Sequence, residues 1–110
     1  MIKISIFYPA GPETRFDHHY YETVHMPMSI ALLGKAVRSV SVERGVSPGP
    51  PWPEPAFVAM AHFVCESKAV YEAALFPHLA RLQGDLVNYS NVPAMIQFSE
   101  IALEHQTPQT

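Results

Sequence analysis

The chain contains 110 residues, of which 48% are apolar and only 15% are charged. This length corresponds to one domain with a single core, and the apolar content excludes a disordered chain. The net charge is −3 and the basic residues are scattered, which argues against a nucleic-acid partner. Because the charged fraction lies below the roughly 25% of ordinary soluble chains, we expect another molecule to cover part of the surface.

The cysteine usage and the absence of long apolar runs predict a cytoplasmic protein. The single cysteine, Cys65, has no partner for an internal disulfide, which is typical of a reducing compartment. The N-terminal residues 1–8 are too short and too alternating for a signal peptide. No apolar run approaches the roughly 20 residues that cross a membrane, so we expect no membrane partner.

The first third of the chain predicts a strand followed by a helix. Residues 2–8 alternate with the period of a strand, and Pro and Gly in residues 9–12 end it. Asp17 suits the N-cap of the helix, and Gly34 suits its end. Met26 is expected on the outer side of this helix. The apolar face of the helix is predicted to contain Tyr20, Tyr21, Val24, Met28, Ala31 and Leu32.

The remainder predicts three strands and a second helix. Residues 36–44 form a strand, with Val40 and Val42 on one face and Val37 on the other. Five prolines in residues 47–55 exclude regular structure there, and residues 56–64 form the next strand. The second helix starts after Ser67, breaks at Pro77 and ends near Gly84, before a last strand at 94–103. We assign residues 1–104 to one domain and residues 105–110 to a tail.

The element order is β-α-β-β-α-β, the pattern of an α+β ferredoxin-like fold with a four-stranded antiparallel sheet. Right-handed crossovers place both helices on one face of this sheet. The predicted strands carry few charges on either face, so the face without helices needs a cover. A second copy related by a two-fold axis supplies one, and we therefore predict a homodimer.

The most informative segment surrounds His25. Tyr21 lies four residues earlier and neighbours His25 on the helix surface. Pro27 supplies no N–H and clashes with the carbonyl of Thr23, so the helix is expected to kink directly after His25. Such a bent helix could form the wall of a pocket. A lone histidine at the edge of an apolar face is more often structural than functional, and periodicity leaves both interpretations open.

Two segments resemble the signatures of the EthD family, small dimeric α+β barrels. The first is Phe16-Asp17-x-x-Tyr20-Tyr21-x-x-x-His25-x-Pro27-Met28, and the second runs from Asp85 through Asn88-Tyr89 and Pro93 to Gln97. Met28 stands where the family usually has Leu, and Asn91 where Asp is common. The resemblance implies a homodimer with one pocket in each subunit. It places His25 and Tyr21 in the pocket as catalytic residues, with Tyr20, Asn88, Tyr89 and Gln97 as substrate-binding residues.

Three functions are compatible with this resemblance. The first is cofactor-independent acid–base chemistry on a small aromatic or carbonyl substrate, with His25 moving the proton and Tyr21 orienting the imidazole or donating to an enolate. In that mechanism Asn88 or Gln97 serves as a neutral donor. The second is a non-catalytic, small-molecule-binding partner of an oxidative degradation system, as the family's association with ethyl tert-butyl ether suggests. The third is haem binding through His25, as in related dimeric barrels.

Metal and cofactor sites have weaker support in the sequence. Glu22 and His25 have the spacing of di-iron ligands, but a matching motif is missing because the second helix offers only Glu72 and His78. The five glycines form no phosphate-binding loop. We therefore expect no metal and no cofactor. The Pro-rich loop matches a PxxP ligand, but a stiff connection with Trp52 against a neighbouring subunit is the favoured interpretation.

Overall fold

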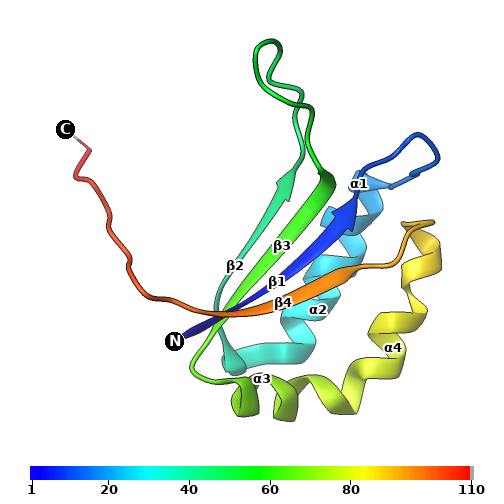
Figure 1. The fold of residues 1–110 in the computed structure, drawn as a ribbon. Coiled ribbons are helices and arrows are strands. Elements are labelled where there is room, and N and C mark those ends of the chain that lie inside the picture. Colours follow the sequence, from blue (N-terminus) through cyan, green and yellow to red (C-terminus); the bar gives the residue numbers. More distant parts are fainter. Residues whose placement is uncertain (110) are drawn as a thin grey trace.

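The computed structural model describes residues 1–109 and shows a four-stranded antiparallel sheet with helices on one face (Figure 1). The strands lie in the order β2-β3-β1-β4. Their bounds are Ile2–Pro9 for β1, Val37–Arg44 for β2, Phe57–Cys65 for β3 and Met95–Glu100 for β4. The helical segments are α1 (His18–Tyr20), the π-helical turn η1 (Tyr21–His25), α2 (Met26–Leu33), η2 (Gly34–Ala36), α3 (Lys68–Leu75), η3 (Phe76–His78), α4 (Leu79–Gly84) and η4 (Leu86–Asn88).

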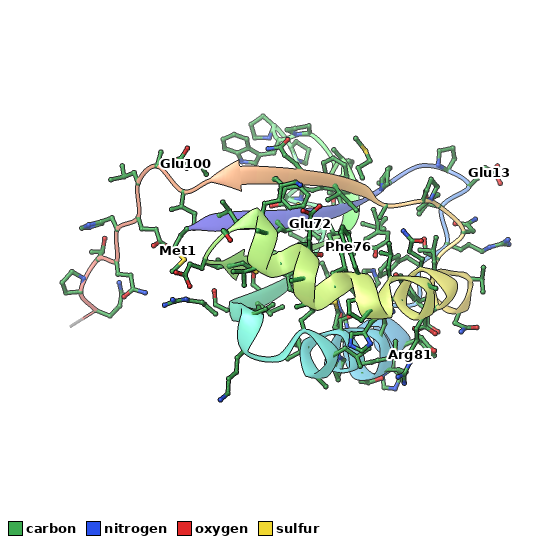
Figure 2. All side chains as sticks on the ribbon, turned by 90° about the horizontal axis from the view of Figure 1, so that it is seen from below. Met1, Glu13, Glu72, Phe76, Arg81 and Glu100 are labelled. Carbon is green, nitrogen blue, oxygen red and sulfur yellow. The ribbon has the colours of Figure 1, made fainter. Side chains whose placement is uncertain are left out.

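The element order βαββαβ confirms the predicted ferredoxin-like α+β class. Figure 2 views the molecule from below and shows the sheet and the helices as two layers. β4 is shorter than the predicted strand and ends at Glu100, and residues 101–109 contain neither helix nor strand. The division into a domain of residues 1–104 and a tail of residues 105–110 stays a prediction, and residue 110 lies outside the described part.

The second helical region follows its sequence signals. The Ser67 hydroxyl accepts a hydrogen bond from the backbone N–H of Val70 at 3.1 Å, which caps α3. Pro77 lies in the 3-10 turn that separates α3 from α4, and α4 ends at Gly84. None of the helices within residues 1–109 is long and apolar enough to span a membrane.

The first helical region contains an irregularity that periodicity did not predict. In the π-helical turn η1, the backbone N–H of Met26 donates to the carbonyl of Tyr21, five residues earlier. This turn holds one residue more than an α-helical turn, so it changes which side chains face the core. Met26 is buried and Val24 is 45% exposed, and the predicted positions of both were wrong. The buried residues of this region are Tyr21, His25, Met26, Ser29 and Leu33.

A second irregularity lies at the start of β2. The pairing of β2 with β3 shifts between Val37 and Ser39, which marks a β-bulge. Val37 consequently packs against the core together with Val40 and Val42. The prediction that Val37 points to the opposite face was therefore wrong, because the bulge inserts one residue into the alternation.

The two faces of the sheet differ in their cover. The face toward the helices carries most of the core, including Ile4, Tyr8, Ala59, Ala61, Phe63 and Cys65. On the other face, Phe7 pairs with Met60 on β3 and with Met95 on β4, so three apolar side chains form a row across the sheet. No helix within residues 1–109 covers this row (Figure 1). We call this surface the open face.

Candidate functional site

A cavity of about 320 Å³ lies between the helices and the sheet. Its walls come from β1, β3, β4, the helical segments η1, α2, α3, α4 and η4, and the segment between η4 and β4. The lining is mainly apolar, and it consists of Ile6, Tyr8, Tyr21, His25, Met26, Ser29, Leu33, Phe63, Tyr71, Leu75, Leu79, Leu82, Gln83, Leu86, Tyr89, Ala94 and Ile96. A mainly apolar cavity with a few polar groups is typical of a small-molecule site.

The imidazole of His25 is held by an acidic partner that the sequence analysis did not assign to the site. Its Nδ1 lies 2.9 Å from Oδ2 of Asp85, and the two side chains are only 9% and 13% exposed. Asp85 follows α4 directly and is 60 residues away in the chain. Because an ionised carboxylate can only accept hydrogen bonds, the Nδ1 of His25 carries the proton. In the neutral imidazole, the Nε2 lone pair is then free to accept.

Two further donors keep Asp85 ionised. The hydroxyl of Tyr20 donates to Oδ1 at 2.7 Å, and Nδ2 of Asn88 donates to the same oxygen at 2.9 Å. Burial alone raises the pKa of the Asp85 carboxyl, but hydrogen bonds from Asn88, His25 and Tyr20 outweigh it and place the pKa below its usual value. Asp85 is thus a carboxylate at neutral pH.

Two tyrosines contact the imidazole, and a third, Tyr8, contacts one of them. The hydroxyl of Tyr89 lies 3.4 Å from Nε2 of His25 and 3.0 Å from the hydroxyl of Tyr8. The ring of Tyr21 stacks on the imidazole with a centroid distance of 5.5 Å. Burial raises the pKa of Tyr8, Tyr21 and Tyr89, so all three remain neutral phenols that can donate hydrogen bonds.

Backbone contacts bring the two halves of the site together. The N–H of Asp17 donates to the carbonyl of Tyr89 at 2.7 Å, and Phe16 forms an antiparallel bridge with Ser90. The side chain of Asn91 accepts from the backbone N–H of Arg15 at 2.7 Å. The segment before α1 is therefore tied to the segment after η4. These bonds place the residues of η1 against those that follow α4.

The structure brings together most of the residues predicted for the site. His25, Tyr21 and Tyr89 line the cavity. Tyr20 and Asn88 lie behind it and contact Asp85. Gln97 does not take part: it pairs with Ser5 across β1 and β4, and its side chain donates to Ser99 on the open face. Its predicted place in the pocket wall was wrong, because the side chains of a strand alternate between faces and Ile96 takes the cavity side.

The sequence analysis missed two site residues, Asp85 and Tyr8. Asp85 is the acidic residue that begins the second EthD-like segment, so its position was visible although its role was not. Tyr8 lies on the same strand face as Ile4 and Ile6, and strand alternation alone predicts it to face the helices. Neither residue could be connected to His25 without the tertiary structure.

The side chains considered as metal ligands lie apart from one another. Glu22 forms a two-point ion pair with the guanidinium of Arg44, with Nη2 2.8 Å from Oε1. The Nδ1 atom of His25 is paired with the carboxylate of Asp85. Across residues 1–109, no group of three or more histidine, cysteine or acidic side chains has the arrangement of a metal site.

Comparison with known proteins finds one matching family model and several similar solved structures. The EthD domain model matches residues 11–92. An EthD-like protein from Ralstonia eutropha JMP134 is 40% identical, with 94% of each chain covered and a TM-score of 0.87. An ethyl tert-butyl ether degradation (EthD) family protein from Bacillus halodurans C-125 is 17% identical, with a TM-score of 0.67 and coverage of 91% of this chain and 97% of that one.

A third structure shares the fold at lower identity. It is a dimeric ferredoxin-like protein from an uncultured marine organism, 9% identical, with a TM-score of 0.52 and coverage of 97% of this chain and all of that one. No curated protein matches the chain.

Proposed function

This chain belongs to the EthD domain family, and on that basis we propose that it catalyses proton transfer on a small, largely apolar carbonyl compound. The observation that carries the proposal is the His25–Asp85 pair at a mainly apolar cavity. A buried carboxylate behind an imidazole fixes the tautomer and orients the ring. The second nitrogen is then available for chemistry.

In the proposed reaction His25 acts as a general base. Its Nε2 takes a proton from the carbon next to the carbonyl group, and the electrons of the C–H bond move to the carbonyl oxygen to give an enolate. The hydroxyl of Tyr89, 3.4 Å from Nε2, donates a hydrogen bond to the developing oxyanion. The protonated imidazole then returns the proton to a carbon or to the oxygen. The reaction is complete without an oxidant or reductant.

The supporting residues have separate roles in this proposal. Asp85 orients the imidazole, which is the role that the sequence analysis assigned to Tyr21. Tyr21 stacks on the ring and limits its rotation. Tyr20 and Asn88 donate to Asp85 and are positioning residues without contact to the cavity. Tyr8 donates to the oxygen of Tyr89, which leaves the Tyr89 hydrogen for the oxyanion.

Deuterium exchange tests the proposal without knowledge of the natural substrate. The protein is incubated with 2-decanone in D2O, and NMR follows the deuterium that enters beside the carbonyl group. We expect exchange with the parent chain and a loss of at least about tenfold in His25→Ala, because general bases contribute factors of this size or larger. His19→Ala is the control, since its side chain is exposed on α1. Equal exchange in His25→Ala would remove His25 from the chemistry.

Binding without catalysis is the second candidate, supported by the mainly apolar lining of the cavity. In that case 2-decanone binds with one molecule per subunit but acquires no deuterium, and His25→Ala changes only the affinity. This outcome would favour a non-catalytic partner of an oxidative degradation system.

The proposed functional unit is a homodimer that buries the open face. This face carries the apolar row Phe7, Met60 and Met95, and Met95 is 54% exposed in the single chain. A monomer seldom leaves such a surface in contact with water. The structural neighbour described as a dimeric ferredoxin-like protein supports a dimer of this fold. Light scattering on the purified protein should give twice the mass of 12.3 kDa.

The cytoplasm is the proposed location. Cys65 is a free thiol, fully buried on β3, and burial raises its pKa so that it stays protonated and unreactive. Cell fractionation of the tagged chain tests this assignment, and recovery in a secreted or membrane fraction would contradict it.

A further inference from the structure

The structure also restricts the chemistry of the ligand. We propose that the cavity selects an uncharged molecule with a hydrogen-bonding head group and a mainly apolar body of about ten non-hydrogen atoms, and that it rejects carboxylates. This inference rests on the proposed function of the cavity, and it names the class of substrate.

The charges around the expected head-group position disfavour an anionic ligand. Within the described residues, the lining contains no lysine and no arginine that could neutralise an anion. The nearest fixed charge is the carboxylate of Asp85, which lies 2.9 Å behind the imidazole of His25. A ligand carboxylate at Nε2 would therefore be buried close to a like charge. Burial and like charge both disfavour the ionised form, so an anionic ligand binds poorly.

The hydrogen-bonding groups of the lining determine which head group the ligand carries. The polar atoms near His25 gather at one end of the cavity, where Nε2 of His25 and the hydroxyls of Tyr8 and Tyr89 are linked. These groups can donate to a carbonyl oxygen, or both donate to a hydroxyl group and accept from it. The hydroxyl of Ser29 is already used, because it donates to the backbone carbonyl of His25 at 3.0 Å.

The rest of the lining determines the polarity and the size of the ligand body. Away from this end the walls are formed by aliphatic and aromatic side chains such as Leu33, Phe63, Leu75, Leu79 and Leu82. Gln83 and the hydroxyl of Tyr71 are the other polar groups of this part of the lining, so most of the ligand body meets apolar walls, where an unpaired polar group is unfavourable. The cavity volume of about 320 Å³ is roughly ten times the volume of a water molecule in the liquid, which sets the expected size.

A matched set of ligands tests the inference. Binding of 2-decanone, decanamide and decanoate to the full chain is measured by calorimetry at neutral pH. Decanamide and decanoate have the same size, so their difference isolates the charge. We expect both neutral ligands to bind at least about tenfold more tightly than decanoate. Decanoate binding as tight as decanamide binding would overturn the selection against anions, while the cavity itself would remain a ligand site.

Asp85→Asn provides the second arm, because it removes the repelling charge and keeps the size of the side chain. The preference for decanamide over decanoate should shrink at least about threefold in this variant. Glu104→Gln, at an exposed position after β4, should leave the preference unchanged. If a folded Asp85→Asn protein kept the full preference for decanamide over decanoate, Asp85 would not be the source of that preference. If none of the three ligands binds the parent chain, both this inference and the proposed function fail.

Discussion

At the scale of single residues, the site depends on how Asp85 is held. It accepts from the imidazole of His25, the hydroxyl of Tyr20 and the amide of Asn88, so three donors meet one carboxylate. Asp85→Asn replaces one acceptor oxygen with a donor that faces other donors. We expect a loss of about 1–3 kcal/mol in the free energy of unfolding, measured by urea denaturation. Glu104→Gln should change it by less than about 0.5 kcal/mol, and equal losses in both variants would contradict the role of Asp85.

The lowered pKa of Asp85 also predicts how stability depends on pH. The pKa of an aspartate in an unfolded chain is about 3.9. In the folded chain the pKa of Asp85 is lower. The folded state therefore binds the proton less readily, and the contribution of Asp85 is complete above the unfolded pKa. It is lost as the pH falls through the folded value. The stability difference between the parent chain and Asp85→Asn should shrink below about pH 4, and a constant difference would contradict the shift.

At the scale of elements, the end of α2 requires a glycine. Gly34 has φ 57° and ψ −135°, a conformation that side chains rarely adopt, although a Cβ there would meet no atom within 4 Å. Gly34→Ala should therefore destabilise the fold by about 1–3 kcal/mol through backbone strain alone. Gly84 also has open space but no positive φ, so Gly84→Ala is the matched control and should be neutral or slightly stabilising. Thermal unfolding distinguishes the two variants.

At the scale of the whole molecule, the proposed homodimer depends on the open face. Met95 lies on this face and is largely exposed in the single chain, so folding does not depend on its burial. Met95→Glu should place a charge in the proposed interface and shift the protein from dimer to monomer at micromolar concentration. Val87→Glu is the control, because Val87 is 82% exposed on η4. Light scattering measures both variants, and a Met95→Glu protein that stays dimeric would exclude this face.

The wrong facing assigned to Val24, Met26 and Val37 has one cause. Val24 and Met26 were assigned to the wrong sides of the helix, and Val37 to the wrong face of β2. In both places the backbone inserts one extra residue, as a π-helical turn or as a β-bulge. Such an insertion shifts the periodic pattern that follows it. Regular periodicity therefore predicted the elements correctly but failed where the period changes within an element.

The local chemistry of the sequence determined the order of the elements and several of their ends, such as the Ser67 cap, the break at Pro77 and the turn at Gly34. These depend on backbone preferences of a few neighbouring residues. Only the tertiary structure decided that Asp85 holds His25 and that Gln97 lies on the other side of the sheet. Contacts across 60 residues depend on how helices and strands pack, and no local pattern records that geometry.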